Sequence, residues 1–297
     1  MKPVIKTFFL FLFLIPVFSV QADNAAKGDR LYKAGKYEEA LRHYLKPDAQ
    51  EKPEVMNRIG YMHNYGRGVE KNTSIGVQWY RKAAELGFAK SQYNLGQCYQ
   101  FGTGVKKNLN EAIKWFRKSA EQEYADAERK IGYLTVTGTG VKQDFGEAMQ
   151  WFRRAAGHGN IRAYADIAHA YAEGYGVKKN KNRAVQYYIM GAEKGDPEAQ
   201  YWLGRAYQLG RGIKHDSARA LYWLNRAADN GNTLAMDALT RIYNSGALDQ
   251  PIDHELAARW AEKAIETRKQ TGESDPDLVK RLRFFGVDVD RMKKPHE

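Results

Sequence analysis

Small and apolar residues recur at every fourth position in short segments of this chain, and a pair of glycines ends each segment. Ala127, Ile131 and Thr135 form one such stripe. Four-residue spacing places side chains on one face of an α-helix, and a following glycine often ends the helix in a left-handed conformation. The pattern therefore predicts a first helix within 125–140 and a second helix within 141–160.

The same pattern returns at a fixed step of 36 residues. The key glycine and its one replacement are Gly60, Gly96, Gly132, Ala168 and Gly204. An aromatic column and a column of glycine pairs keep the same step: Trp79, Trp115, Trp151, Tyr187 and Trp223, with Gly66/Gly68, Gly102/Gly104, Gly138/Gly140, Gly174/Gly176 and Gly210/Gly212. A repeat of this length indicates a solenoid, whose units bury their apolar faces against one another. We therefore expect an all-α fold, a right-handed α/α superhelix of about six repeats with terminal caps.

Each second helix is preceded by an asparagine or aspartate that can accept hydrogen bonds from the free N–H groups of the first turn. These residues are Asn72, Asn108, Asp144, Asn180 and Asp216. Glu111 and Glu147 stand three residues after a cap and predict reciprocal capping boxes in two repeats. A small residue follows four positions after each cap, and we expect it to face the aromatic column across neighbouring helices.

Beyond the five regular repeats, the pattern predicts a sixth repeat and a cap at each end. Tyr243 keeps the step, whereas Trp260 is shifted by one residue. Terminal units of a solenoid differ from the inner ones because one of their faces meets solvent. We therefore divide the chain into a signal peptide (1–22), a short helical pair as N-terminal cap (23–52), six repeats (53–88, 89–124, 125–160, 161–196, 197–232 and 233–269) and a C-terminal capping helix with a tail (270–297).

Two segments carry a recognisable motif. The segment Leu95-Gly96-x-x-Tyr99-x-x-Gly102-x-Gly104-Val105 is followed by Asn108-x-x-x-Ala112-x-x-Trp115. Over residues 53–269 the chain resembles the Sel-one-like repeat family, a relative of the tetratricopeptide repeat. The resemblance implies an adaptor or scaffold role, in bacterial envelopes, exopolysaccharide assembly, motility or host contact. Some secreted relatives carry a cysteine pair in each repeat and are linked to β-lactam or peptidoglycan binding, and this chain lacks those pairs.

The N-terminus predicts export. Lys2 and Lys6 precede an apolar run over 7–20, and small residues at Val20 and Ala22 fit a cleavage site. The run is shorter than the roughly 20 residues of a membrane span. We expect cleavage after Ala22 and a periplasmic or secreted protein without a membrane span, and an uncleaved anchor is the alternative.

Charge and cysteine content narrow the choice of partners. The 297-residue chain carries a formal net charge of +12, or 45 − 35 = +10 once Lys2 and Lys6 are removed. Cys98 is the single cysteine, so no disulfide can form within the chain, and its place in an apolar column predicts core packing. Nucleic acid is not an expected partner of a secreted chain in spite of this charge.

No catalytic motif stands out. The glycine pairs follow helices and lack the third glycine of a dinucleotide-binding loop. The seven histidines form no His-x-x-x-His pair, and no cysteine cluster accompanies them. We expect no catalytic residue, no metal and no cofactor, and an enzyme acting on β-lactams or peptidoglycan is the least favoured alternative.

The first helix of each repeat has an exposed face at −3, +1 and +4 from the key glycine. In the family that the chain resembles, this helix lines the concave side. Tyrosine, arginine and amide side chains, which suit binding surfaces, gather on this face. We expect a protein partner to bind Asn57, Tyr61, Tyr93, Gln97, Arg129, Tyr133, His169, Tyr201, Arg205 and Gln208. The expected anchors are Tyr93, Tyr133, Tyr201 and Arg205, and a merely solvated face is the alternative.

Basic residues follow the valine or isoleucine after each glycine pair. They are Lys106, Lys107, Lys142, Lys178, Lys179 and Lys214, here named the lysine ridge. Stacked repeats would align them along one edge, where they could attract an acidic protein, an anionic glycan or lipid headgroups. A role in solubility explains them equally well. Two functions therefore compete: a non-catalytic protein-interaction scaffold of the envelope, and a module that binds peptidoglycan or another anionic polysaccharide.

Overall fold

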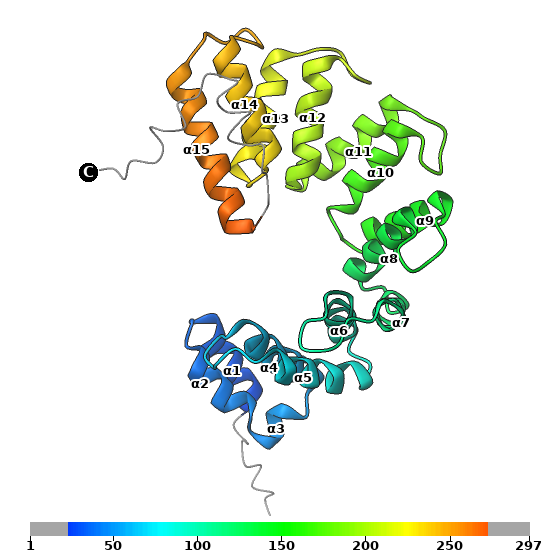
Figure 1. Ribbon diagram of the computed structural model, residues 1–297, viewed down its shortest axis with the longest axis vertical. Helices are drawn as coiled ribbons and strands as arrows, with labels where there is room; N and C mark the ends of the chain where they lie inside the picture. The colour runs from blue at the N-terminus through cyan, green and yellow to red at the C-terminus, as the bar shows by residue number, and fades with distance from the viewer. Residues whose placement is uncertain (1–22, 273–297) are drawn as a thin grey trace, which may run out of the picture. The chain divides into compact units, whose positions relative to one another are not determined.

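A computed structural model describes residues 23–272, which are nearly all helical and contain no strand (Figure 1). The helices are α1 (Asn24–Lys33), α2 (Tyr37–Tyr44), α3 (Pro47–Gln50), α4 (Pro53–Tyr65), α5 (Thr73–Glu85), α6 (Ala89–Phe101), α7 (Leu109–Ala120), α8 (Ala125–Thr137), α9 (Phe145–Gly157), α10 (Ala163–Glu173), α11 (Lys181–Glu193), α12 (Pro197–Leu209), α13 (Ser217–Asp229), α14 (Thr233–Ser245) and α15 (His254–Thr271). The expected all-α repeat fold is confirmed. The predicted signal peptide, and the predicted C-terminal cap beyond residue 272, lie outside the described residues.

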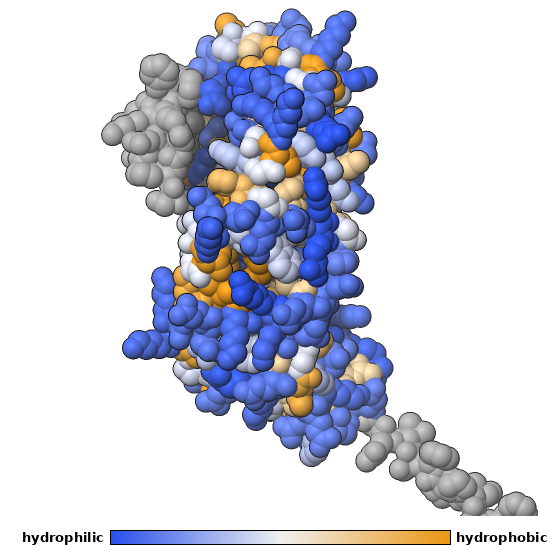
Figure 2. Space-filling view, turned by 90° about the vertical axis from the view of Figure 1, so that its right-hand side faces the viewer, coloured by the Kyte–Doolittle hydropathy of each residue, from blue (hydrophilic) through white to orange (hydrophobic). Residues whose placement is uncertain are grey.

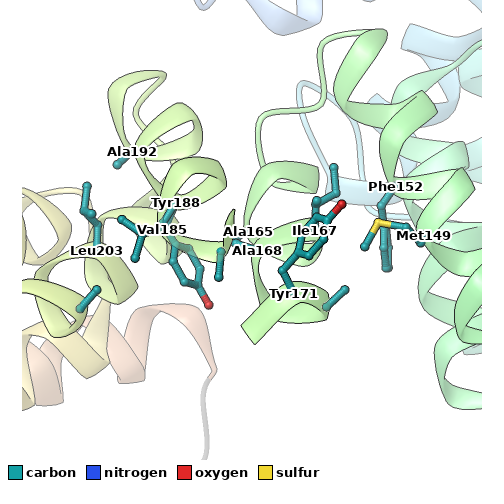
Figure 3. Packing of buried hydrophobic residues seen from close by; sticks show 14 of the residues in the cluster. Met149, Phe152, Ala165, Ile167, Ala168, Tyr171, Val185, Tyr188, Ala192 and Leu203 are labelled. Atoms are coloured by element: carbon teal, nitrogen blue, oxygen red, sulfur yellow. The ribbon is translucent and has the colours of Figure 1, made fainter. Parts of the chain in front are cut away.

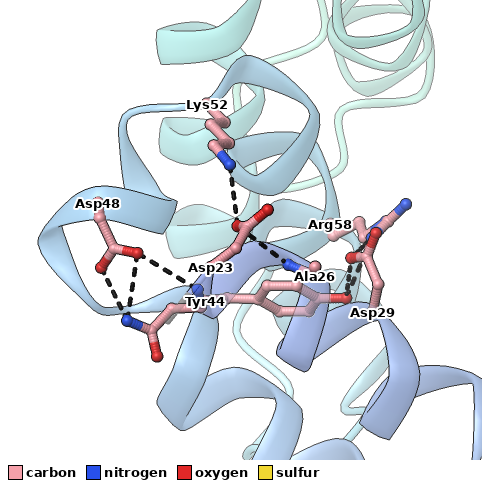
Figure 4. Close-up of polar contacts among 8 residues, drawn as sticks. Asp23, Ala26, Asp29, Tyr44, Asp48, Lys52 and Arg58 are labelled. Atoms are coloured by element: carbon pink, nitrogen blue, oxygen red, sulfur yellow. Dashed lines mark hydrogen bonds and ion pairs between the residues drawn. The ribbon is translucent and has the colours of Figure 1, made fainter. Parts of the chain in front are cut away.

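The helices form two compact units, which divide between Trp79 and Tyr80 within α5. In the N-terminal unit, the buried Tyr44 of α2 donates its hydroxyl to Asp29 of α1 over 2.8 Å. Arg58 of α4 forms an ion pair with the same carboxylate and donates to the Tyr44 hydroxyl over 3.2 Å (Figure 4). Burial raises the pKa of Tyr44 to about 12. These contacts tie the short helical pair α1–α2 to the first repeat.

The second unit consists of helix pairs in which each helix packs against the helices before and after it. The first helices of its repeats are α6, α8, α10, α12 and α14, and the second helices are α7, α9, α11, α13 and α15. This succession is a solenoid-like arrangement of repeats. Cys98 of α6 is buried, as its apolar column predicts. None of the helices within residues 23–272 is both long enough and apolar enough to cross a membrane.

The ends of the helices follow the sequence signals. The first glycine of each pair caps a first helix in the left-handed conformation, with φ between 61° and 86°. The predicted asparagine and aspartate caps accept backbone hydrogen bonds at the start of each second helix. The predicted capping boxes are wrong. The N–H of Asn108 donates to the carbonyl oxygen of Tyr99 over 2.9 Å, so it is not free for Glu111, and the N–H of Asp144 is likewise not free for Glu147.

The key glycines let the two helices of one repeat approach closely. A Cβ atom on Gly132 would lie 2.7 Å from the ring of Phe152, and one on Gly96 would lie 2.7 Å from the ring of Phe116. The residue directly after the aromatic column therefore packs on the glycine. The core continues from α9 into α10, α11 and α12, where Tyr171 and other side chains interdigitate (Figure 3).

Four of the five residues in the aromatic column are only partly buried, whereas Trp115 is buried. Trp151 is only partly buried, and its indole N–H donates to Glu147 over 3.1 Å. The guanidinium of Arg154 covers its ring at 4.7 Å, and Lys118 covers Trp115 at 4.6 Å in the preceding repeat. Cations in the last turns of α7 and α9 thus stack on an aromatic ring, in addition to opposing the helix dipole.

Candidate binding site on the first-helix face

Three of the ten predicted residues lie together in one pocket on the face formed by the first helices. Tyr93 of α6 and both Arg129 and Tyr133 of α8 line a pocket of about 600 Å³. Its other lining residues come from α8 and from the connection between α9 and α10: Asp126, Lys130, Gly159, Asn160, Ile161 and Arg162. The pocket is therefore lined by residues of three successive repeats, which a partner could bridge. The surface is otherwise largely hydrophilic in the face shown by Figure 2, with apolar residues in a few patches.

Two tyrosines give the pocket its aromatic character. The ring of Tyr93 lies 5.6 Å from Phe116 and 5.5 Å from Tyr124, and Gln97 donates an amide hydrogen to its hydroxyl over 2.9 Å. Burial raises the pKa of Tyr93, so the phenol stays neutral. Tyr133 is 54% exposed, so its ring is open to contact with a partner. An exposed tyrosine beside a fixed one suits the anchoring of an apolar side chain.

Arg129 is held by a partner within the protein. It donates from Nε (2.5 Å) and from one terminal nitrogen (3.1 Å) to the two carboxylate oxygens of Asp166 on α10. Burial raises the pKa of the Asp166 carboxyl, and the bonds from Arg129 counteract only part of that rise. This bidentate pair joins the first helices of successive repeats and leaves Arg129 little freedom to orient a ligand.

The remaining cations of the pocket are Lys130 and Arg162, and neither forms an ion pair with any carboxylate of the described residues. The ammonium of Lys130 lies 5.8 Å from the ring centre of Phe116 and 6.0 Å from that of Tyr133. Burial lowers the pKa of Lys130, and the neighbouring Arg129 lowers it further. Asp126, the one acidic lining residue, accepts a hydrogen bond from Asn160 over 2.7 Å. With three cationic side chains and one acidic side chain, the lining of the pocket is net positive.

A second, smaller pocket of about 140 Å³ lies between α10, α11 and α12, and two predicted residues, His169 and Arg205, line it. His169 bonds Glu198 through Nε2 (3.2 Å) and the Tyr188 hydroxyl through Nδ1 (3.0 Å). The hydrogen bond from His169 holds the pKa of the Glu198 carboxyl below its usual range, against the effect of burial. Both ring nitrogens of His169 are therefore engaged in joining helices.

Two predicted contact residues are not exposed. Asn57 is 6% exposed and Tyr201 is 7% exposed. Tyr201 packs in the core between α12, α13 and α14, where its ring meets Trp202 edge-on at 5.0 Å. Helices of neighbouring repeats cover Tyr201, which the geometry of a single helix cannot show. The expected exposure of Asn57 as a contact residue and of Tyr201 as an anchor is therefore wrong.

The last predicted residues are half-buried. Tyr61, in the N-terminal unit, lies 4.5 Å from the ring of Tyr65 and under the guanidinium of Arg67 at 5.3 Å. Gln208 accepts a hydrogen bond from Arg205 over 2.6 Å. Neither residue lines either of the two pockets.

The sequence pattern missed Lys130 and Arg162. Lys130 lies two positions before Gly132, outside the expected face, and Arg162 precedes α10 in a connection whose course the repeat does not specify. No signal in the sequence singles out Arg162, because Asp166 stands four residues after it as an acidic neighbour on the same helical face.

The six residues of the lysine ridge are all exposed. Lys178 and Lys179 additionally line a separate pocket at the start of α11, together with two arginines. Among residues 23–272, no group of three or more histidine, cysteine, aspartate or glutamate side chains is placed to hold a metal ion.

Successive two-helix repeats with pockets between them define a helical repeat protein. The chain belongs to the Sel1 repeat family, because the Sel1 repeat model matches residues 53–88, 89–124, 125–160, 161–196, 197–232 and 234–266. Sel1 repeat proteins generally mediate protein–protein interaction and are typically non-catalytic scaffolds.

Solved structures agree with this assignment. A Sel1 repeat protein from Oxalobacter formigenes is 56% identical, with 82% of this chain and 97% of that chain covered and a TM-score of 0.77. The protective antigen c5321 of uropathogenic Escherichia coli, which has an SLR fold, is 24% identical over 88% of this chain and 67% of its own, with a TM-score of 0.60. Immunity protein Pa5087 of Pseudomonas aeruginosa is 21% identical over 80% and 88%, with a TM-score of 0.54. The last two show a shared fold alone. No curated protein matches the chain significantly.

Proposed function

We propose that this protein is a non-catalytic scaffold of the bacterial envelope that holds an acidic segment of a partner protein in the pocket of Tyr93 and Tyr133. The observation that carries the proposal is the combination, in one pocket, of an exposed tyrosine with the two cations Lys130 and Arg162. The membership of this chain in the Sel1 repeat family, whose proteins generally mediate protein–protein interaction, supports the same function.

The chemistry of the pocket indicates the bound segment. Because Arg129 is already paired with Asp166, a ligand carboxylate would meet Lys130 and Arg162 instead. The ring of Tyr133 offers apolar area to an adjacent aliphatic or aromatic side chain. The expected motif is therefore an acidic residue next to an apolar one.

The location in the envelope rests on the sequence of residues 1–22, with two lysines, an apolar run and small residues before Asp23. Fractionation of the bacterial cell followed by N-terminal sequencing tests it. A periplasmic or secreted form that begins at Asp23 supports export, and a cytoplasmic form that retains residues 1–22 contradicts it.

The binding proposal is tested by capture from envelope extract with the chain lacking residues 1–22, followed by calorimetry with the captured partner. We expect Tyr133→Ala to weaken binding about thirtyfold, which corresponds to the roughly 2 kcal/mol of a hot-spot residue. Arg162→Ala should weaken it to a similar degree and reduce its dependence on salt.

Tyr222→Ala is the matched control, because Tyr222 is 52% exposed but lies on second helix α13, outside the pocket. Its removal should leave binding unchanged. Equal affinity of the Tyr133→Ala and Arg162→Ala variants and of the unmodified protein would exclude this pocket as the site.

A further inference from the structure

A third pocket, of about 530 Å³, lies at the start of α11 and is lined mostly by basic residues. Its lining residues are Arg153, Tyr171, Val177, Lys178, Lys179, Asn180 and Arg183. Four of these seven are cationic and none is acidic. Such a concentration of like charge is unfavourable unless something in the protein or in solution compensates for it.

A single buried tyrosine holds two of the cations in place. Tyr171 of α10 is 5% exposed, and its ring belongs to the core cluster drawn in Figure 3. Its hydroxyl accepts hydrogen bonds from Arg153 of α9 (3.2 Å) and from Arg183 of α11 (3.5 Å). The guanidinium of Arg183 also lies over the Tyr171 ring at 5.6 Å. Two guanidinium groups from different repeats thus converge on one atom.

The protein does not neutralise these charges. Within residues 23–272, Arg153, Lys178 and Arg183 form no ion pair, and only Lys179 has one, with Glu173 at 3.3 Å. Burial by itself would raise the pKa of Tyr171, yet hydrogen bonds from Arg153 and Arg183 outweigh burial and lower it. The N-terminus of the 13-residue helix α11, whose first turn contains no acidic residue, adds a further positive dipole end.

The equivalent places in other repeats lack this combination. In the fifth repeat, Tyr207 accepts from Arg219 over 3.4 Å, but Arg219 is paired with Asp216 at 3.5 Å. The position of Arg153 is there occupied by Ile189. In the second repeat, Glu111 occupies the position of Arg183. The arginine pair is therefore specific to the junction of the third and fourth repeats and is not imposed by the repeat pattern.

The glycine loop brings the two sides of the pocket together. A Cβ atom on Gly176 would lie 2.3 Å from the carbonyl oxygen of Phe145, the first residue of α9. Because no other residue permits this approach at φ 66°, the loop that bears Lys178 stays close to the helix that bears Arg153. Gly176 thus keeps the backbone of the Lys178 loop against the start of α9.

We propose that this pocket binds a phosphate group. Guanidinium groups suit phosphate because their planar N–H donors match two oxygens at once, and the lysines add charge without directional demands. The pocket has room for a phosphate that is carried on a larger molecule as well as for a free one. The site is independent of the tyrosine pocket proposed above, which other residues form.

The test is binding of pyrophosphate and inorganic phosphate to the full chain without residues 1–22, by calorimetry and ³¹P NMR. Vesicles of phosphatidylglycerol in phosphatidylcholine are the second probe. We expect Arg153→Gln with Arg183→Gln to weaken binding of either probe at least about tenfold, as loss of charge-assisted hydrogen bonds does. Arg219→Gln is the matched control, since Arg219 bonds a tyrosine in the same way but has a carboxylate partner.

A second control separates the pocket from the ridge. Lys106→Ala with Lys107→Ala removes the same charge from a repeat without the arginine pair and should leave phosphate binding unchanged. Thermal melting confirms that each variant is folded. Binding of free phosphate assigns the ligand to a free compound, and binding of vesicles alone assigns it to a lipid headgroup.

Three results with the phosphate probes and variants would overturn the proposal, and a competition experiment gives a fourth. They are no saturable binding of any phosphate probe, equal binding by the double arginine variant, and equal loss in the Lys106/Lys107 variant. Competition by polygalacturonate, which carries carboxylates only, at the same charge concentration would also overturn it, because the site would then be a general polyanion site. Tyr133→Ala should not affect phosphate binding, so this inference and the proposed protein scaffold can fail separately.

Discussion

At the scale of single residues, the close packing of helix pairs depends on the absence of a side chain at the key glycines. The ring of Phe152 occupies the space that a side chain on Gly132 would need. Phe152 is 5% exposed and cannot move without disturbing the core around it. A glycine inside a helix costs helical stability, and here the close contact that it allows offsets that cost.

The variant Gly132→Ala should therefore destabilise the protein, although alanine is the better helix former. We expect a net loss of about 1–2 kcal/mol, because overpacking of a core outweighs the gain in helix propensity. Gly157→Ala is the matched control, since Gly157 is helical and a Cβ there would meet nothing within 4 Å. It should stabilise by up to about 1 kcal/mol. Chemical denaturation measures both, and equal changes in the two variants would contradict the packing argument.

Residues with local roles could be predicted from the sequence, and residues whose role depends on a neighbouring repeat could not. Asn108 caps a helix and Cys98 is buried, because spacing along one or two helices decides both. Tyr201 was expected to be exposed, but α13 and α14 cover it. Arg129 was expected to bind a partner, but an aspartate 37 residues later holds it.

At the scale of elements, ion pairs join first helices of successive repeats in addition to the apolar core. The pair of Arg129 and Asp166 is well shielded, with side chains 28% and 17% exposed. By contrast, the pair of Glu255 and Arg259 lies within α15 with side chains 78% and 70% exposed. Shielding and bidentate geometry make the first pair the stronger contributor.

We expect Asp166→Asn to destabilise the protein by about 2 kcal/mol, since Arg129 would keep its charge and lose its charged acceptor. Glu255→Gln should change stability by less than about 0.5 kcal/mol. Urea denaturation at neutral pH measures both. If Asp166→Asn is as mild as Glu255→Gln, the pair between α8 and α10 is not a structural link.

The bond between His169 and Glu198 predicts a pH dependence. The folded-state pKa of Glu198 lies below the usual 4.5, so its contribution to stability is present above that value and is lost as the pH falls through the folded pKa. The unmodified protein should therefore melt at a higher temperature than Glu198→Gln at neutral pH. Well below pH 4.5, the two should melt at the same temperature. A difference that persists in strong acid would show that the charge of Glu198 does not matter.

The tyrosine pocket shows why a binding site between elements is harder to predict than the elements. The helical pattern placed Tyr93 and Tyr133 on one face, and both line the pocket. Arg162 enters from the connection before α10, where no helical periodicity applies. Such a site can be predicted only when the stacking of the repeats is known. The pattern within one repeat does not contain that information.

At the scale of the whole molecule, a solenoid lacks contacts between distant repeats. In the second unit each helix packs mainly on its neighbours along the chain, and the core cluster around Tyr171 extends only from α8 to α13 with Leu248. Stability in such an array is a sum of repeat and nearest-neighbour terms. Damage in one repeat should therefore spread to its neighbours and fade beyond them.

The variant Phe152→Ala tests this directly, because it should remove about 3–5 kcal/mol from the third repeat. We expect hydrogen exchange, followed by mass spectrometry, to accelerate most in α8 and α9 and next in the flanking helices α7 and α10. Exchange in α14 and α15 should change little, because these helices share no core cluster with Phe152. Uniform acceleration from α6 to α15 would instead show that the unit unfolds as one cooperative body. Since the third repeat supplies most of the lining of the tyrosine pocket, local opening there would also weaken partner binding while the rest of the array stays folded.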